Sequence, residues 1–216
     1  MTNAFPILLS RLLVCCLILW SIPASAESRP TLLVLGDSLS AGYGVPAGSG
    51  WVDLLRQRLR DKERDWAVVN ASITGDTTRG GLSRLPAALA RHRPRVVIVE
   101  LGGNDGLRGF PLAQIRANLR KLVQLSRQSG ARVLLLGVRL PPNYGEYAER
   151  FHALYREVGE AEGVPVVDFF MEGVAENRDL MQADGIHPGT AAQPRLLDNV
   201  WPALRPLLSD TAKAGD

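Results

Sequence analysis

The sequence predicts a three-layer, doubly wound α/β domain built on a parallel sheet of five strands. Short apolar runs alternate with longer amphipathic segments from residue 31 onward. The short runs are apolar on both faces, which is typical of parallel strands that helices cover on each side. Strict alternation of strand and helix predicts right-handed crossovers, which place helices on both faces of one sheet.

The five expected strands are rich in β-branched residues. They span residues 31–35, 67–69, 96–101, 133–138 and 164–167. The expected helices lie between them, at 51–64, 80–92, 111–129 and 147–162, with a last helix after Pro188. Pro111 suits a first helical position, and Gly130 suits a C-terminal cap. No repeat or linker divides residues 27–216, so we expect a single domain.

The first 26 residues predict a secretory signal peptide. Arg11 gives a mildly positive start, an apolar stretch follows at 12–22, and Ala24-Ser25-Ala26 is a small-residue cleavage site. The apolar stretch is shorter than the roughly 20 residues that span a bilayer, so no stable membrane insertion is expected after cleavage. Cleavage after Ala26 predicts a periplasmic or secreted protein. Cys15 and Cys16 both fall in this segment, so the mature chain would contain no disulfide.

The composition excludes several classes of partner. The formal net charge of +3 falls by one when Arg11 is removed, and no basic stripe with interleaved aromatics is present, so nucleic acid is not expected. No clustered histidines or cysteines offer zinc ligands, and the acidic residues are too dispersed for a calcium loop. We therefore expect no metal and no cofactor, and we also expect a monomer.

Candidate functional residues follow the ends of the expected strands. Ser38 comes after the first strand, Gly75 after the second and Asn104 after the third, and Asp184 and His187 come after the fifth. In a doubly wound sheet the ligand site lies beyond the carboxyl ends of the strands. We therefore expect these residues to meet at one edge of the sheet.

Ser38, Asp184 and His187 predict a serine hydrolase acting on esters. A serine hydroxyl needs an imidazole to take its proton, and the imidazole needs a carboxylate to fix its tautomer. The chain order serine, aspartate, histidine is that of esterase-type hydrolases. The other two histidines, His92 and His152, are expected at the solvated surface of helices.

Acyl transfer also requires donors for the oxygen that becomes negative. The candidates are the backbone amide of Ser38, Gly75, and the carboxamide of Asn104. Each has a plainer interpretation, as a helix cap, a turn and an Asx turn respectively. Their shared position at the sheet edge favours an oxyanion hole.

Four sequence blocks together resemble the SGNH or GDSL hydrolase family. They are Gly36-Asp37-Ser38-Leu39, Gly75 within 73–77, Gly102-Gly103-Asn104-Asp105, and Asp184-Gly185-Ile186-His187-Pro188. The similarity runs through nearly the whole mature chain and is closest to the bacterial thioesterase I, arylesterase and lysophospholipase L1 group.

The resemblance implies a flavodoxin-like sheet and the same site residues. It implies Ser38, Asp184 and His187 as the triad, and Ser38, Gly75 and Asn104 as the oxyanion hole. It also implies a mobile loop at 106–111. The residues expected to line an acyl groove are Leu107, Arg108, Phe110, Pro141, Pro142 and Tyr144.

Two glycine patterns formally match nucleotide-binding motifs. Residues 42–47 fit a dinucleotide fingerprint, which should follow a strand directly. Here the five residues 37–41 come between the expected strand and the pattern, and Pro46 lies within it. Residues 75–81 lack the lysine of a phosphate loop. Neither pattern predicts a nucleotide site.

The predicted function is that of an exported serine esterase that forms an acyl-enzyme. Its expected substrates are aryl esters, acyl-CoA in vitro and lysophospholipids. A carbohydrate O-deacetylase of the same fold and a non-catalytic acyl-binding module remain as alternatives.

Overall fold

A computed structural model of the chain describes residues 29–62 and 64–209. The expected signal peptide, residues 1–26, lies outside the described residues. Within them, no helix combines the length and the apolar character needed to cross a membrane.

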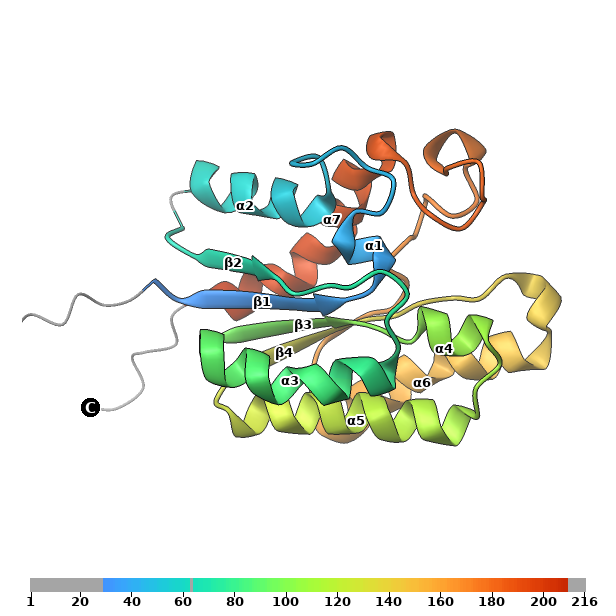
Figure 1. Ribbon diagram of the computed structural model, residues 1–216, viewed down its shortest axis with the longest axis horizontal. Helices are drawn as coiled ribbons and strands as arrows, with labels where there is room; N and C mark the ends of the chain where they lie inside the picture. Colours follow the sequence, from blue (N-terminus) through green and yellow to red (C-terminus); the bar gives the residue numbers. More distant parts are fainter. Residues whose placement is uncertain (1–28, 63, 210–216) are drawn as a thin grey trace, which may run out of the picture.

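One parallel sheet of five strands forms the centre of the molecule (Figure 1). Every neighbouring pair of strands is parallel, and the order is β2-β1-β3-β4-β5. This order is that of the flavodoxin-like type, so the predicted fold class is confirmed. The strands are β1 (Thr31–Gly36), β2 (Ala67–Asn70), β3 (Val96–Glu100), β4 (Arg132–Leu136) and β5 (Val166–Val167).

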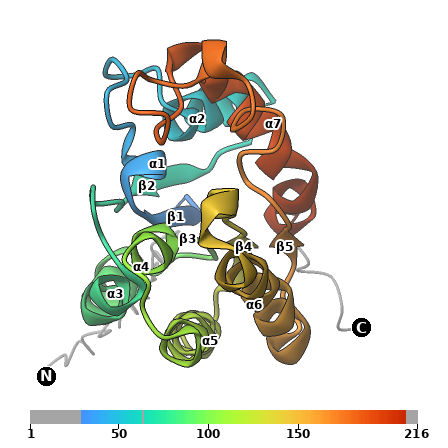
Figure 2. The ribbon, with the colours of Figure 1, turned by 90° about the vertical axis from the view of Figure 1, so that its right-hand side faces the viewer.

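Helices cover both faces of this sheet (Figures 1 and 2). On one face lie α2 (Trp51–Asp61) and α7 (Gln193–Leu204); on the other lie α3 (Thr78–His92), α5 (Leu112–Gln128) and α6 (Glu146–Glu162). Two short helices, α1 (Ser38–Ala41) and α4 (Gly103–Leu107), follow β1 and β3 at one edge of the sheet. Four 3-10 turns complete the described part: Pro142–Tyr144, Arg178–Leu180, Thr190–Ala192 and Arg205–Leu208.

Two hydrophobic clusters, one on each face, explain why the strands are apolar throughout. In β1, Leu33 and Leu35 pack into the cluster under α3, α5 and α6, whereas Leu32 and Val34 pack into the cluster under α2 and α7. All four side chains are fully buried. Burying a side chain of this size contributes roughly 1.5–3 kcal/mol. The two-sided burial therefore holds the end of β1, and the residues that follow it, in a fixed position.

Element boundaries differ from the predicted ones by a few residues. Pro111 lies just outside α5 instead of in its first turn, and β5 pairs with β4 only through Val166 and Val167. Helix α3 begins two residues early, because the side chain of Thr77 caps it by accepting from the Gly80 amide at 3.1 Å. Helices α1 and α4 were not predicted, since four or five residues are too few to show a helical period.

Candidate active site

The candidate nucleophile sits in the sharp turn between β1 and α1. Asp37 caps α1 by accepting from the Leu39 amide at 3.1 Å, and Ser38 is the first helical residue. A Cβ at Gly36 would lie 2.8 Å from a carboxylate oxygen of Glu100, so only glycine fits there. The end of the buried strand thus presents Ser38 at the carboxyl edge of the sheet.

Ser38, His187 and Asp184 form a continuous chain of hydrogen bonds. His187 Nε2 lies 2.9 Å from Ser38 Oγ, and His187 Nδ1 lies 2.7 Å from Asp184 Oδ2. A carboxylate beside Nδ1 favours the tautomer with its proton there. Nε2 is then an acceptor for the serine hydroxyl. The structure brings together three residues that the sequence places up to 149 positions apart.

Asp184 is held by the backbone of the residues that follow it. Its Oδ1 accepts from the amides of Ile186 at 2.9 Å and His187 at 3.0 Å. The His187 amide is the main cause that lowers the pKa of Asp184 to about 2, with the imidazole and the Ile186 amide adding to it. The group beside the imidazole is therefore a carboxylate at neutral pH.

The segment that carries Asp184 and His187 is a hairpin tied to the nucleophile turn. Gln182 donates its backbone amide to His187 O at 2.8 Å, and Met181 pairs with Pro188. The side chain of Gln182 donates to Pro188 O at 3.1 Å and to Tyr43 O at 2.7 Å. One glutamine thus connects the histidine to the residues just after α1. Sequence reasoning did not identify Gln182, because a single glutamine has no motif.

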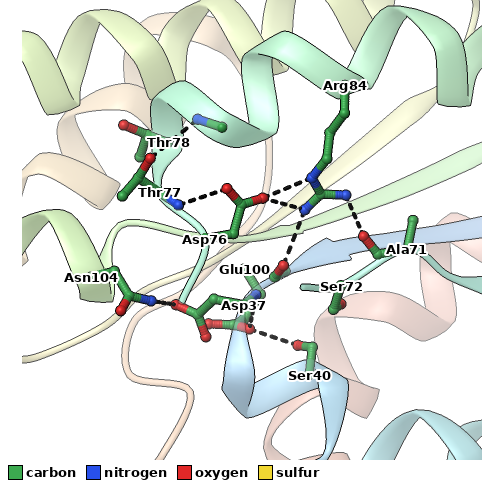
Figure 3. A network of polar contacts seen from close by, with 12 residues as sticks. Asp37, Ser40, Ala71, Ser72, Asp76, Thr77, Thr78, Arg84, Glu100 and Asn104 are labelled. Carbon is green, nitrogen blue, oxygen red and sulfur yellow. Dashed lines mark hydrogen bonds and ion pairs between the residues drawn. The ribbon is translucent and has the colours of Figure 1, made fainter. Parts of the chain in front are cut away.

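Asn104, a predicted oxyanion-hole residue, lies beside the nucleophile turn. It stands in the first turn of α4, and its Nδ2 donates to Asp37 Oδ2 at 3.1 Å (Figure 3). A carboxamide carries two N–H donors, so one remains available for a ligand.

Gly75 lies on the segment between β2 and α3. Its backbone has φ = +79°, a conformation that favours glycine, and open space surrounds the position of a Cβ. The segment is fixed to the end of β1, because the Ile73 amide donates to Gly36 O at 3.0 Å.

Arg84 of α3 ties the Gly75 segment to β1 (Figure 3). Its guanidinium pairs with Asp76 at 2.7 Å, donates to Ala71 O, and donates to Gly36 O at 3.2 Å. An arginine has five N–H donors in a rigid plane, which suits it to bridge several acceptors at once. The sequence analysis did not identify Arg84, as it did not identify Gln182, as a residue that positions the site.

Two carboxyl groups are buried under the site. Glu100 is fully buried; its Oε2 accepts from Ser40 Oγ at 2.7 Å and from the Asp37 amide at 3.3 Å. Its Oε1 has no partner within the described residues. Burial raises the pKa of Asp37 to about 6; burial, followed by the charge of Asp37, raises the pKa of Glu100 well above its usual value. A lone glutamate ending an apolar strand was the available sequence signal.

The expected acyl-groove residues are brought together only in part. Tyr144 Oη donates to Leu107 O at 3.0 Å, and both residues pack partly buried against the hydrophobic cluster with Phe110. Tyr147, which the sequence analysis missed, donates to Phe110 O at 2.6 Å. Arg108 is exposed and donates to Gly75 O at 3.3 Å.

Pro141 and Pro142 are exposed. Pro142 begins the 3-10 turn that ends at Tyr144, and Pro141 is the residue just before this turn. The structure thus joins Leu107, Phe110 and Tyr144 and leaves the two prolines at the margin.

The remaining histidines differ from the predicted solvated surface. His152 has a side chain only 22% exposed, with Nε2 3.0 Å from Asp168 O and 3.3 Å from Asp168 Oδ1. It is half-buried because its face of α6 meets the segment after β5. His92 ends α3 as predicted but is also half-buried. Within 29–62 and 64–209, no cluster of three or more His, Cys, Asp or Glu side chains is arranged to hold a metal ion.

A flavodoxin-like sheet with a serine, histidine and aspartate at its carboxyl edge defines a class of ester hydrolases. The comparison with family models agrees with this class. Residues 34–194 match the GDSL-like Lipase/Acylhydrolase family, and the chain belongs to that family. The resemblance found in the four sequence blocks is confirmed, and the protein is an enzyme that acts on ester bonds.

Several relatives match most of the chain. Esterase TesA of Pseudomonas aeruginosa is 55% identical over 89% of this chain and 96% of its own length. Arylesterase of Vibrio mimicus is 44% identical over 89% and 94%. Thioesterase 1/protease 1/lysophospholipase L1 of Escherichia coli is 48% identical over 85% and 88%. A crystal structure of TesA superposes with a TM-score of 0.81 at 57% identity, covering 82% of this chain and 99% of that one.

Proposed function

We propose that the protein is an exported serine esterase that hydrolyses carboxylic esters and thioesters through an acyl-enzyme. The observation that carries the proposal is the pair of short hydrogen bonds from Ser38 Oγ to His187 Nε2 and from His187 Nδ1 to Asp184 Oδ2. A hydroxyl, an imidazole and a carboxylate in this order are the parts that activate a serine nucleophile.

The reaction has two halves that use the same base. Ser38 Oγ attacks the acyl carbonyl while His187 takes the hydroxyl proton, and His187 then gives this proton to the leaving alcohol or thiol. Water next attacks the acyl-enzyme, and His187 again takes and returns a proton. Asp184 keeps the imidazole oriented and stabilises its charged form.

The tetrahedral intermediate carries a negative oxygen that needs donors. We assign this role to the backbone amide of Ser38, to Gly75 and to the free N–H of Asn104. Gly75 allows a ligand to come close because no side chain stands in the way. Losing one such donor typically costs about 2.7–4 kcal/mol in the transition state.

The acyl chain is assigned to the surface formed by Leu107, Arg108, Phe110, Pro141, Pro142 and Tyr144. Esterase, arylesterase, thioesterase and lysophospholipase are the activities in the names of the relatives. We infer aryl esters, acyl-CoA and lysophospholipids as substrates in vitro. Cleavage of residues 1–26 would place a monomeric enzyme in the periplasm or outside the cell, away from cytoplasmic CoA thioesters, so acyl esters are the inferred physiological class.

A fluorophosphonate probe tests the nucleophile. We expect one covalent adduct per chain, on Ser38, and loss of both labelling and p-nitrophenyl butyrate hydrolysis in Ser38→Ala. The matched control is Ser83→Ala, since Ser83 is exposed on α3. Intact mass and peptide mapping give the site of the adduct. An adduct elsewhere, or full activity in Ser38→Ala, contradicts the proposal.

A chain-length series tests the substrate class. Hydrolysis of acyl esters from acetyl to palmitoyl should continue into medium and long chains if the assigned surface binds acyl groups. Activity confined to acetyl esters would instead support a carbohydrate O-deacetylase.

A further inference from the structure

Three large apolar side chains are exposed within the described residues, and each lies in a segment that carries a candidate site residue. Tyr43 is 49% exposed, Ile73 53% and Ile186 46%. Ile73 stands two residues before Gly75, and Ile186 directly precedes His187. A large apolar side chain left exposed beside a candidate site is available to contact an apolar ligand.

The ring of Tyr43 borders the imidazole of His187, and Ile186 is the residue before His187 in the chain. The ring centroid of Tyr43 lies 4.5 Å from that of His187, with the planes at 43°. Ile186 adjoins His187 in the chain, and its amide donates to Asp184 Oδ1 at 2.9 Å. An exposed aromatic and an exposed aliphatic side chain thus accompany the general base.

Two hydrogen bonds fix the backbone of Tyr43, one to the nucleophile turn and one to the hairpin of His187. Its amide donates to Ser38 O at 3.1 Å, and its carbonyl accepts from Gln182 Nε2 at 2.7 Å. Gly44 makes room for that glutamine, since a Cβ there would lie 2.1 Å from Gln182 Oε1. The ring of Tyr43 is therefore carried by an anchored backbone beside the base.

The chemistry of acylation determines what this surface contacts. The bond from Ser38 Oγ to the acyl carbon forms, the bond from that carbon to the leaving oxygen breaks, and His187 Nε2 passes the serine proton to the leaving oxygen. That oxygen must come within about 2.6–3.2 Å of Nε2. The group attached to it then lies near the imidazole, which the ring of Tyr43 borders and which Ile186 precedes in the chain.

We propose that Tyr43 and Ile186 form a leaving-group subsite that selects flat, apolar alcohols such as phenols. The proposal rests on the proposed serine mechanism and adds a second specificity surface, separate from the acyl surface at Leu107 and Tyr144. A phenyl leaving group can pair with the ring of Tyr43 and cover Ile186, and aromatic pairs gain stability beyond the area they bury. An ethyl leaving group makes neither contact to the same extent.

Two esters of one acid, phenyl butyrate and ethyl butyrate, test the subsite. In Tyr43→Ala, the ratio of kcat/KM for phenyl over ethyl butyrate should fall about tenfold, the upper range for an aromatic pair. The comparison of variant with wild type removes the different intrinsic reactivity of the two esters. Tyr43→Phe should keep the wild-type ratio, because it retains the aromatic ring. Ile186→Ala should lower the ratio by a smaller factor than Tyr43→Ala.

Hydrolysis of the butyryl-enzyme separates binding from positioning. Both esters form the same acyl-enzyme after the leaving group departs, so a leaving-group contact cannot affect its breakdown. We expect the deacylation rate and its pH dependence in Tyr43→Ala to match those of the wild type in single-turnover experiments. The matched control is Tyr144→Ala, which should change the octanoate-to-butyrate ratio equally for both leaving groups.

The subsite is overturned by an equal loss for phenyl and ethyl butyrate in Tyr43→Ala, by no loss for either ester, or by slower deacylation. The first and third results would mean that Tyr43 acts by holding His187. Failure of the proposed function is seen separately, as hydrolysis or labelling that survives Ser38→Ala.

Discussion

At the scale of single residues, Asn104 donates one amide hydrogen to Asp37, and its carboxamide has a second N–H. The bond from Asn104 Nδ2 to Asp37 Oδ2 is 3.1 Å long, and Asp37 Oδ1 accepts from the Leu39 amide. The aspartate next to the nucleophile thus orients the proposed oxyanion donor. Because Asp37 is an acceptor at both oxygens, its amide analogue cannot reproduce both bonds.

We expect Asp37→Asn to lower kcat by about 10²-fold, the lower range for loss of one oxyanion donor. The new amide either turns its N–H₂ toward Asn104 or forces that carboxamide to rotate, and both outcomes misplace the donor. Steady-state kinetics with p-nitrophenyl butyrate give kcat and KM. If the effect passes through Asn104, Asp37→Asn should cost little more in an Asn104→Ala background, and independent, additive losses would contradict this coupling.

At the scale of elements, the site depends on contacts between segments that lie far apart in the sequence. Gln182 joins the hairpin of His187 to the turn after α1, where it contacts Tyr43, 139 positions earlier in the chain. Arg84 joins the Gly75 segment to the end of β1, 48 residues away. In each connection a side-chain donor binds backbone carbonyls. These hydrogen bonds hold the loops in position although the loops do not belong to the sheet.

Gly44→Ala tests the glutamine connection. Both Gly44, at φ = +69°, and Gly48, at φ = +86°, have backbones that disfavour alanine, but only Gly44 faces the side chain of Gln182. The shared backbone cost is roughly 1–2 kcal/mol. We expect Gly44→Ala to lower kcat/KM several-fold more than Gly48→Ala, because the methyl group displaces Gln182 and with it the hairpin of His187. Thermal denaturation of both variants gives the stability comparison, and equal activities would show that Gln182 can move without harm.

At the scale of the whole molecule, the buried carboxyl groups make folding stability depend on pH. Native Asp37 keeps its proton to about pH 6 and Glu100 keeps its proton well above 4.5, so both have raised pKa values. The unfolded chain releases these protons at lower pH and therefore binds fewer of them in this range. By linkage, these groups make the free energy of unfolding fall as pH rises from about 4 through 6 and beyond.

We expect Glu100→Gln to reduce the decrease in the free energy of unfolding that accompanies rising pH. Glutamine retains an acceptor for Ser40 Oγ and the Asp37 amide but no longer pays the desolvation of a charge. Denaturant unfolding between pH 4 and 8 should show a stability difference, variant minus wild type, that grows as pH rises above about 4.5. The exposed Ser83→Ala removes no titratable group, so it serves as control and should give a constant difference. Parallel curves for Glu100→Gln would contradict the raised pKa.

Much of the fold and the proposed triad was accessible from the sequence because each rests on a local pattern. The two-sided apolar runs predicted β1 and β3, and the chain order of Ser38, Asp184 and His187 predicted the hydrogen-bonded relay that the structure shows. Short elements escaped, since α1 has only four residues. His152 was placed on the solvated surface because its helix neighbours are charged, but its contact is with Asp168 across the fold.

The sequence by itself determined the alternation of strands and helices, the parallel sheet and the set of reactive residue types, because these depend on side-chain period and chemistry within short windows. Tertiary structure alone decided that Asp37 orients Asn104, that Gln182 and Arg84 anchor the loops, and that Tyr43 lies 4.5 Å from His187. These contacts have no local pattern. They arise when packed strands bring distant loops to one edge, where a single amide or guanidinium can reach carbonyls from several of them.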